Sequence, residues 1–397
     1  METLIPKTKL LQSIPSYLQA AIYASAGHFR RYDPVWSVSS VNNEFPETEL
    51  WDFAHRGILK HMSSPNLSVL QALLIYLQRP LNDASTSASY ERPGQWALLG
   101  SATNIATQLG LHLDCTDWSI PDWEKRLRRR LWWITYSEAT WRCLLLGLPH
   151  PIHNDQWDVS ELTDADFLMD HIRCPAEETA TQDPAFQKPC AYCHSGHDFC
   201  FLAQLAVIAN NVNKSMYTIS ATKKRSQEFG SCLADGRDLL EQLRTWQSSL
   251  PEHMSTTFAS DPNDRDYFHS GSSSHLKLSS LTLEMLIYRA LLRPTGKGQA
   301  DQGGPCPQQA SNEDIAKCFR ESLHLVRKAS SFAQSLTPYD LNSFSYSCRY
   351  LFLTLFSTHM QYHSHWTLLN YSCRVAIMLF GFVKLHFASS GPISYVK

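Results

Sequence analysis

The sequence contains no long apolar run. Its apolar stretches are short, as in residues 375–383, whereas a helix needs roughly 20 apolar residues to cross a bilayer. Residues 1–20 contain an early pair of lysines and two prolines, but no apolar run before a small-residue cleavage site. We therefore expect a soluble chain without a signal peptide and without membrane contact.

The sequence also lacks an excess of charge of one sign. Its 35 basic and 37 acidic side chains give a formal charge of -2, so no overall basic field exists to recruit nucleic acid or an anionic surface. The 11 cysteines are odd in number and lack the dense, regular spacing of a secreted disulfide scaffold, which favours reduced, intracellular thiols. We expect the chain in the nucleus or the cytoplasm.

Common catalytic signatures are missing as well. The sequence has no phosphate loop, no dinucleotide-binding glycine pattern and no Gly-x-Ser-x-Gly turn. His359, His363 and His365 lie close together in the sequence, but no glutamate lies between them, unlike the His-Glu-x-x-His pattern of zinc hydrolases. We therefore expect that the chain is not an enzyme.

The strongest positive signal is helical periodicity. Apolar residues recur at three- to four-residue steps, as at Leu70, Leu73, Leu74 and Leu77, whereas alternating runs bounded by Asn-Gly dipeptides are missing. With 43% hydrophobic and 11% aromatic residues, the chain can bury a sizeable core. These features predict an all-α fold with long polar surface loops. The expected helices span residues 67–78, 95–109, 119–146, 199–216, 223–248, 275–292, 314–336 and 343–361, and the expected polar connections span 82–93, 155–187, 255–273 and 294–312.

We expect four parts along the chain. Residues 1–14 form an N-terminal segment, residues 15–295 a helical unit, residues 296–312 a loop rich in Gly, Pro and Gln, and residues 313–397 a C-terminal helical extension. The composition of the loop gives it little packing potential. No internal repeat is evident.

Residues 109–149 carry the most distinctive local signals. Gly110 can adopt the left-handed conformation that ends a helix. Ser119 lies in a Ser-x-Pro-Asp sequence, which predicts a capped helix start. Gly147 and Pro149 predict the end of that helix. The apolar residues between them form one stripe, which comprises Trp123, Leu127, Leu131, Ile134, Trp141 and Leu145.

This segment resembles the fungal-specific transcription factor domain, the middle regulatory region of fungal zinc binuclear cluster transcription factors. The resemblance covers roughly residues 15–295 and includes residues 66–72 and 157–159. Residues 114–125 look most like regulators of secondary nitrogen-source use. The family-motif residues in this chain are Gly110, Leu111, His112, Arg128, Arg129, Arg130, Trp132, Trp133, Gly147 and Pro149.

The resemblance implies a transcription regulator in the nucleus. Its all-α regulatory domain is expected to act through protein contacts and through a small effector bound between helices. The implied partners are transcriptional coregulators, a second chain in a homo- or heterodimer, and promoter DNA reached indirectly or through a module outside this chain. Two alternatives stay open: a coregulator without DNA binding of its own, and a helical enzyme with an unrecognised site.

Two features depart from the family pattern. The family's DNA reader holds two zinc ions with six cysteines, whereas this chain has no cysteine before Cys115. We therefore expect no cofactor in this chain, and zinc only in a cluster module encoded upstream of Met1. The family also has an aspartate and an arginine where this chain has Ala139 and Leu148. A buried ion pair between those two positions is therefore expected to be absent.

A cluster of cysteine and histidine supplies the candidate metal ligands. Cys190, Cys193, His197 and Cys200 lie close together in the sequence, and thiolate and imidazole groups suit zinc. The cysteine spacing matches half of the six-cysteine cluster, but the second half is missing. We therefore favour a polar loop that leads into a helix in which Cys200 is buried, without a metal ion.

Two further features have competing interpretations. The cations of residues 125–130 could bind phosphate or direct nuclear import. On a helix they spread around the exposed arc, so we favour a solvated, ion-paired face. Trp132 and Trp133 could form a ligand-stacking wall, but at helical spacing beside Leu131 they are more typical of a core.

Overall fold

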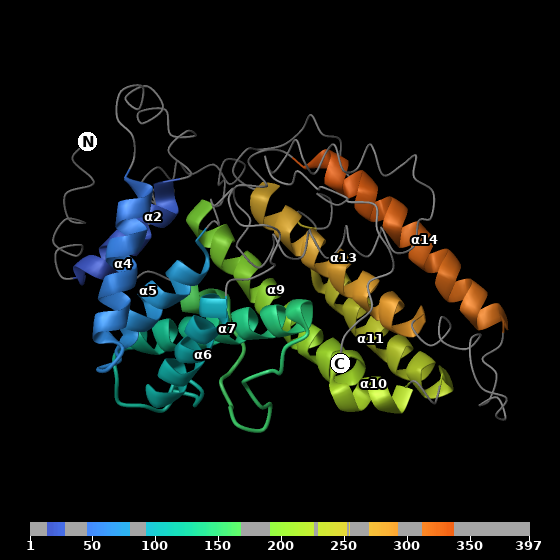
Figure 1. The fold of residues 1–397 in the computed structure, drawn as a ribbon, viewed down its shortest axis with the longest axis horizontal. Helices are drawn as coiled ribbons and strands as arrows, with labels where there is room; N and C mark the ends of the chain where they lie inside the picture. The colour runs from blue at the N-terminus through green and yellow to red at the C-terminus, as the bar shows by residue number, and fades with distance from the viewer. Residues whose placement is uncertain are drawn as a thin grey trace, which may run out of the picture.

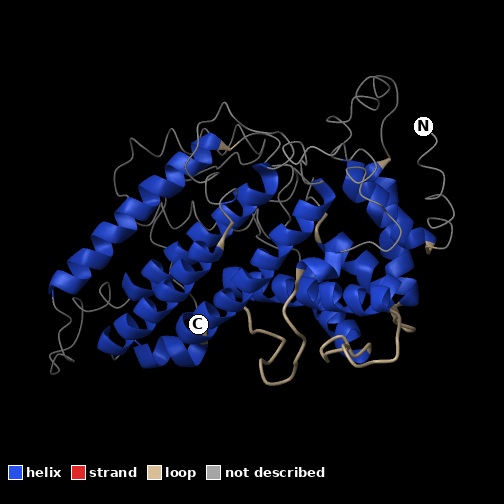
Figure 2. Cartoon of the chain, turned by 180° about the vertical axis from the view of Figure 1, so that it is seen from behind, coloured by secondary structure: helices blue, strands red, loops and turns tan. Residues whose placement is uncertain are grey.

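The structure is a computed structural model, and every secondary-structure element in its described residues is a helix (Figures 1 and 2). This confirms the predicted all-α fold. None of these described helices is both long and apolar enough to cross a membrane. The expected helix at 343–361 and the apolar stretch at 375–383 lie outside the described residues. Those residues are 14–27, 46–79, 93–167, 191–225, 229–251, 254, 270–292 and 312–336.

The helices fall into two groups along the chain (Figure 1). The first group comprises α2 (Ser16–Ala26), α4 (Glu47–His61), α5 (Leu67–Leu77), α6 (Pro93–Gln108), α7 (Asp122–Leu146) and the 3-10 helix η4 (Asp164–Phe167). The second group comprises α9 (Ala191–Val212), the π-helix η6 (Asn213–Tyr217), α10 (Ile219–Arg225), α11 (Phe229–Ser249), α13 (Ser270–Leu292) and α14 (Asn312–Ser335).

Most expected helices correspond to observed ones. The predictions at 67–78, 95–109 and 314–336 match α5, α6 and α14 closely. The helix expected at 223–248 corresponds to the end of α10 and to α11, and residues 226–228 between them lie outside the described part of the chain.

The first hydrophobic core surrounds α5, which contacts α2, α4, α6 and α7. Leu70, Leu73 and Leu77 of α5 have no exposed surface. The helix begins after Asn66, whose side-chain oxygen accepts a hydrogen bond from the Val69 N–H at 3.1 Å. This cap satisfies an amide that would otherwise lack a partner at the helix start.

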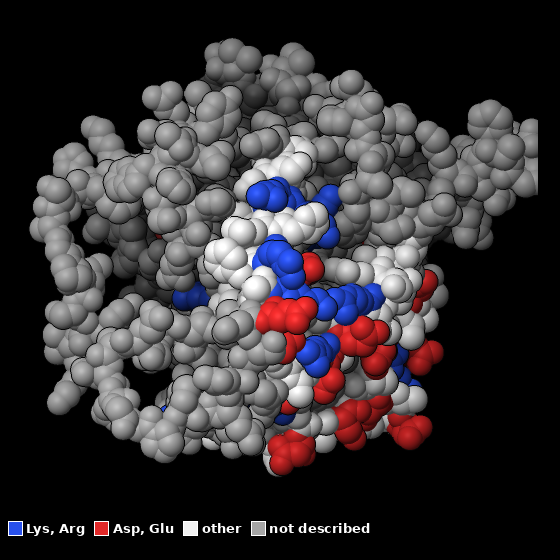
Figure 3. Space-filling model, turned by 90° about the vertical axis from the view of Figure 1, so that its right-hand side faces the viewer, with Lys and Arg blue, Asp and Glu red and all other residues white. Residues whose placement is uncertain are grey.

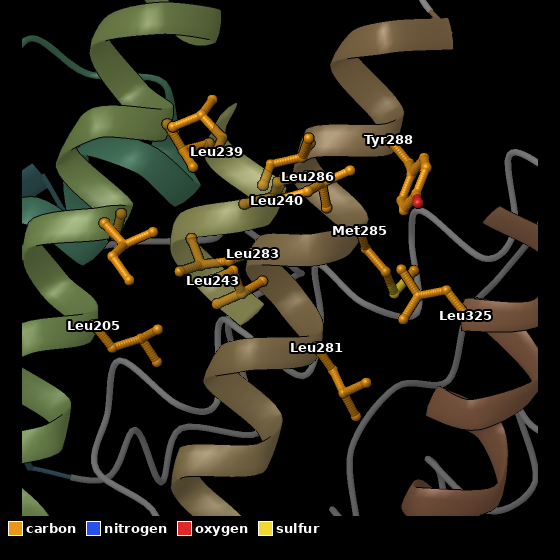
Figure 4. Close-up of a cluster of buried hydrophobic side chains, with 14 of the residues drawn as sticks. Leu205, Leu239, Leu240, Leu243, Leu281, Leu283, Met285, Leu286, Tyr288 and Leu325 are labelled. Carbon is orange, nitrogen blue, oxygen red and sulfur yellow. The ribbon is translucent and has the colours of Figure 1, made fainter. Parts of the chain in front are cut away.

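The second core lies between α9, α11, α13 and α14 (Figure 4). Leu243 of α11 lies beside Leu283 of α13, and Met285 on the other side of α13 points toward Leu325 of α14. Because α13 has apolar side chains on both sides, it packs between α11 and α14.

Two helices belong to both cores. Trp132 of α7 lies in the first core and Leu144 of the same helix lies in the second. On α9, Ala203 belongs to the first core and Leu205 to the second. α7 and α9 also pack against each other, so this helix pair joins the two cores.

The predicted helix stops are confirmed, but the predicted start of α7 is wrong. Gly110 has φ 71 and Gly147 has φ 67, the left-handed conformation in which glycine avoids the Cβ clash. The cap expected at Ser119 is not formed. α7 begins at Asp122, and the carbonyl of Pro121 accepts hydrogen bonds from the amides at the first turn, with no side-chain cap.

The apolar stripe of α7 is shorter than predicted. Trp123, in the first turn, is 53% exposed. Leu127 is half-buried, and Leu131 and Trp141 are buried. The stripe therefore begins one turn later, because no described residue covers the start of α7 on the side of Trp123.

The connection expected to lie on the surface at 155–187 is partly buried. Its residues 168–187 lie outside the described part of the chain. Val159 and Leu162 are 5% and 7% exposed, and Asp166 is 1% exposed. These buried side chains pack against α7 and α9, whereas most of the other described residues of the connection are exposed, as predicted.

Arg142 of α7 is a buried cation that joins three helices. Its side chain is 1% exposed. Its Nε donates to the Glu138 carboxylate at 3.2 Å. One terminal nitrogen donates to the Gln95 side-chain oxygen at 3.2 Å, and the other donates to the Leu77 carbonyl at 2.8 Å. The guanidinium therefore satisfies the C-terminal end of α5 and fixes the start of α6 on α7.

Candidate functional site

The family-motif residues lie where two loops pack against α7. The first loop, residues 111–121, precedes α7, and the second, residues 148–163, follows it. The backbone N–H of Asp114 donates to the Asp158 carboxylate at 2.8 Å, and the Ser160 N–H donates to the Asp114 carboxylate at 2.9 Å. These two reciprocal hydrogen bonds hold the loops together across α7.

The carboxyl group of Asp114 has a lowered pKa. Burial alone would raise the pKa of its carboxyl group, but hydrogen bonds from Thr116 and Ser160 outweigh this effect and lower the pKa to about 2. Such bonds are formed with the charged carboxylate and disappear when it is protonated. The loop connection therefore depends on the negative charge of Asp114.

Two arginines of the motif form ion pairs and are largely covered by the rest of the fold. Arg128 is 16% exposed, pairs with Glu124 at 2.8 Å and donates to the Leu109 carbonyl at 2.9 Å. Arg129 is 18% exposed and pairs with the buried Asp166 at 2.7 Å. The ion pairing that we predicted is present, but the predicted solvated face is only partly exposed, because Arg128 bonds to the Leu109 carbonyl after α6 and Arg129 to Asp166 of η4.

Arg130 and Lys125 complete this interaction set. Burial lowers the pKa of the Arg130 guanidinium, and its central carbon lies 5.8 Å from the ring centroid of Phe167. Lys125 donates to the Thr116 carbonyl at 2.8 Å. The basic run thus binds loops of its own chain.

The tryptophan pair lies in the core, as predicted. Trp132 is 1% exposed and Trp133 is 3% exposed. Trp157 of the second loop packs against both rings, tilted to Trp132 at a centroid distance of 5.9 Å and edge-to-face with Trp133 at 5.5 Å. The Trp133 indole donates to the Ser160 carbonyl at 2.9 Å, so the pair fixes the second loop as well as filling the core.

The remaining motif residues support the same packing. Leu111 is 1% exposed, and the ring of His112 lies 6.3 Å from that of Trp132. The carbonyl of Pro149 accepts a hydrogen bond from the Cys143 thiol at 3.3 Å. These motif residues therefore support the fold through side-chain contacts, and Gly110 and Gly147 support it through their left-handed backbone conformation.

A buried polar network links α7 to α9 beside Pro149. The Nε2 of His150 lies 2.9 Å from the Thr140 hydroxyl, and its Nδ1 lies 2.7 Å from the Ile152 carbonyl. Burial lowers the pKa of His150 to about 4, so the imidazole is neutral at pH 7. Asn210 of α9 donates to the Tyr136 hydroxyl at 2.9 Å. The network ends one turn before the π-helix η6, a conformation that is frequent at functional sites.

One cavity is a groove between α9 and α11, which we call the α9–α11 groove. Its volume is about 570 Å³, which falls in the range of small-molecule sites. It is lined by Trp133, Glu161, Leu162, Cys200, Ala203, Gln204, Val207, Ile208, Asn211, Asp238, Glu241, Gln242, Thr245, Trp246 and Ser249.

A smaller cavity of about 340 Å³ lies between α4, α5 and α6. Three of its lining side chains, His55, Tyr76 and Arg79, contact each other. The Arg79 guanidinium lies 4.2 Å from the ring centroid of Tyr76, and His55 stacks on the same ring at 4.9 Å. The α9–α11 groove is therefore the better candidate for a binding site.

The candidate metal ligands are only partly described. Cys190 lies outside the described residues, and Cys193 and His197 lie on α9 without described side chains. Cys200 is buried and lines the groove. Burial raises the pKa of its thiol to about 12, so it is a neutral thiol at pH 7. In the part of the chain that is described, no three metal-ligating side chains come together.

Sequence reasoning missed both the groove and the Arg142 junction. The groove draws residues from α7, residues 161–162, α9 and α11, which no local pattern connects. The one available signal was Trp133, which we predicted to be in the core and which also borders the groove.

The chain matches one protein family. The family described as the fungal specific transcription factor domain matches residues 8–250. The match begins before α2 and ends with α11, so it includes the motif loops, the polar network and the α9–α11 groove.

Curated relatives are fungal regulatory proteins. An uncharacterized transcriptional regulatory protein of Schizosaccharomyces pombe is 25% identical over 94% of this chain and 48% of its own length. The transcriptional activator protein DAL81 of Saccharomyces cerevisiae is 24% identical over 83% of this chain and 34% of its own length. The acetamidase regulatory protein of Aspergillus fumigatus is 33% identical over 25% of this chain and 12% of its own length.

The chain thus spans less than half the length of each of these relatives. No solved structure matches it.

Proposed function

Because the chain belongs to the fungal specific transcription factor domain family, we propose that it is the regulatory region of a transcription regulator that acts in the nucleus. The single observation that carries this proposal is the family match over residues 8–250, supported by relatives whose names denote transcriptional regulators. The same relatives favour regulation over catalysis. The likeness of residues 114–125 to regulators of secondary nitrogen-source use suggests genes of that class as targets.

The proposed region acts through protein contacts rather than by reading DNA. The formal charge is -2, and on the face seen in Figure 3 the described basic side chains lie beside acidic ones. The motif arginines, which could have touched phosphate, pair with Glu124 and Asp166 instead. Promoter DNA would be reached through a partner or through a zinc-binding module outside this chain, and coregulators or a dimer partner would bind the helical surface.

A small effector could control these contacts by population shift. α9 belongs to both cores, borders the groove and carries the polar network. A ligand in the groove that prefers one position of α9 would shift the packing of both cores by as much as its differential affinity allows. The surface presented to a partner would change with that packing.

A reporter assay tests the proposed function. The chain is fused to an unrelated DNA-binding domain in a fungal host, with a reporter gene under the matching operator. We expect reporter output to differ from that of the DNA-binding domain alone, either upward or downward. The Arg142→Met variant, which removes the buried junction, should lose this effect, whereas the exposed-pair variant Arg244→Met should keep it.

Unchanged reporter output, with nuclear fusion protein at normal abundance, would contradict the proposal. The family's role would then not extend to this chain on its own.

A further inference from the structure

We propose that the α9–α11 groove binds a small cationic ligand with an apolar body, such as a primary amine that carries an aromatic ring or an alkyl chain. This inference rests on the proposed function, because it gives the effector of that regulatory region a site and a chemical class.

The floor of the groove is apolar and aromatic. Trp133 of α7, Leu162 of the second loop and Trp246 of α11 are 3%, 7% and 5% exposed, and each borders the cavity. Trp246 is held in place because its indole donates to the Phe201 carbonyl at 3.2 Å. The indole N–H groups of Trp133 and Trp246 both donate to backbone carbonyls. The two rings are therefore fixed and form a surface on which an apolar body can pack.

The rim of the groove is acidic. Glu161 and Asp238 are exposed, and neither forms an ion pair with any described residue. A third carboxylate, Glu241, pairs with the exposed Arg244 at 3.5 Å. Among the described residues that line the groove, none is Lys, Arg or His. Carboxylates beside an apolar floor attract an ammonium group, which also interacts favourably with the faces of tryptophan rings.

The same features disfavour two other ligand classes. An anionic ligand would face the carboxylates of Glu161 and Asp238 with no lining cation to offset the repulsion. A covalent adduct would need a reactive thiolate, but Cys200 is neutral because burial raises its pKa to about 12. The groove therefore fits a reversible, cationic ligand.

The groove also connects the ligand to the fold. The Asn211 side chain of α9 donates to the Gln242 side chain of α11 at 3.0 Å, which bridges the two helices at the cavity. A ligand between Glu161, α9 and α11 would contact all three at once, so binding would fix the position of α9 relative to α11.

Calorimetric titration of the purified full chain with three matched probes tests the proposal. The probes are 4-phenylbutylamine, 4-phenylbutanol and 4-phenylbutyrate, which share an apolar body and differ in the charge of the head group. We expect saturable binding that is tightest for the amine, weaker for the alcohol and weakest for the carboxylate. Added salt should weaken the binding of the amine and leave that of the alcohol unchanged, because only the amine binds by charge.

Three variants locate the site. The double variant Glu161→Gln with Asp238→Asn should lower the affinity for the amine about tenfold and leave the affinity for the alcohol unchanged. Thr245→Trp, at an exposed rim position, should fill the groove and lower the affinity for both the amine and the alcohol. Glu49→Gln, an exposed carboxylate on α4, is the matched control and should change neither. Circular dichroism spectra and melting curves show that each variant is folded.

Equal affinity for the three probes, absence of saturable binding, or amine binding that is unchanged in the double variant would overturn the proposal. These outcomes are independent of the reporter assay. A chain that controls the reporter but ignores the amine refutes this site alone, and a chain that binds the amine without affecting the reporter refutes the regulatory function alone.

Discussion

The buried Arg142 gives the sharpest stability prediction. Replacing it with methionine keeps much of the apolar volume but removes the guanidinium that joins Glu138, Gln95 and the Leu77 carbonyl. Breaking a buried ion pair by removing one partner costs about 3–5 kcal/mol, because the remaining charge stays uncompensated. We expect Arg142→Met to lower the free energy of unfolding by an amount in this range.

A double-mutant cycle separates the charge from the hydrogen bonds. In Arg142→Met with Glu138→Leu, no uncompensated carboxylate remains, but the Leu77 carbonyl still lacks its donor. Leaving that acceptor unsatisfied costs about 1–3 kcal/mol. The double variant should therefore be more stable than the Arg142→Met single variant, which is the reverse of additive behaviour.

Urea unfolding, followed by circular dichroism at 222 nm, measures these differences. The matched control is Arg244→Met, which breaks an exposed pair of 3.5 Å on α11 and should cost less than about 1 kcal/mol. A loss under about 1 kcal/mol in Arg142→Met, or a double variant less stable than the single one, would refute the assignment of a buried structural ion pair.

Three further predictions concern the motif loops. Asp114→Asn should reduce the loss of unfolding free energy at acid pH. The pKa of the Asp114 carboxyl group is about 2 in the folded chain and 3.8 ordinarily, so its stabilisation is present above pH 4 and is lost as pH falls through 2. Urea unfolding at several pH values checks this. Gly147→Ala should cost about 1–2 kcal/mol from backbone strain alone, since the new Cβ would contact nothing within 4 Å. Gly110→Ala should cost more, because its Cβ would lie 3.2 Å from the Trp118 ring. Thermal melts that show equal losses for the two variants would exclude the contact with Trp118. The contribution of His150 should lower stability by roughly 3 kcal/mol between pH 6.5 and 4, because its imidazole binds a proton in the unfolded chain at its ordinary pKa of 6.5 and in the folded chain only near 4. Burial also lowers the pKa of His275 to about 4, so His150→Leu should reduce the pH slope without abolishing it, and an unchanged slope would show that His150 is not buried in solution.

The helices were predictable from sequence because their signals are local. The spacing of Leu70, Leu73 and Leu77 and the stops at Gly110 and Gly147 depend only on residues within a few positions of each other. Such patterns persist whatever the rest of the fold does.

Errors arose where distant parts of the chain decide the outcome. Ser119 had the sequence of a helix cap, but the loop before α7 is fixed by hydrogen bonds from Asp114 to residues 158–160. The sequence predicted a solvated face for the arginines of α7, but Arg129 pairs with the buried Asp166 of η4, which lies 37 positions further along the chain. The candidate groove likewise depends on α7, residues 161–162, α9 and α11 meeting, which requires tertiary contacts that no sequence spacing encodes.

The packing of α13 has a consequence for how this family is cut into fragments. The family match ends at residue 250, yet Leu276, Leu283 and Ile287 of α13 have no exposed surface and belong to the same core as α11. A recombinant fragment that stops at residue 250 would expose the α9 and α11 faces of that core to water and would favour aggregation. Expression boundaries drawn from sequence similarity alone therefore fall inside a folding unit, and fragments should include α13 and α14 and continue past Leu336.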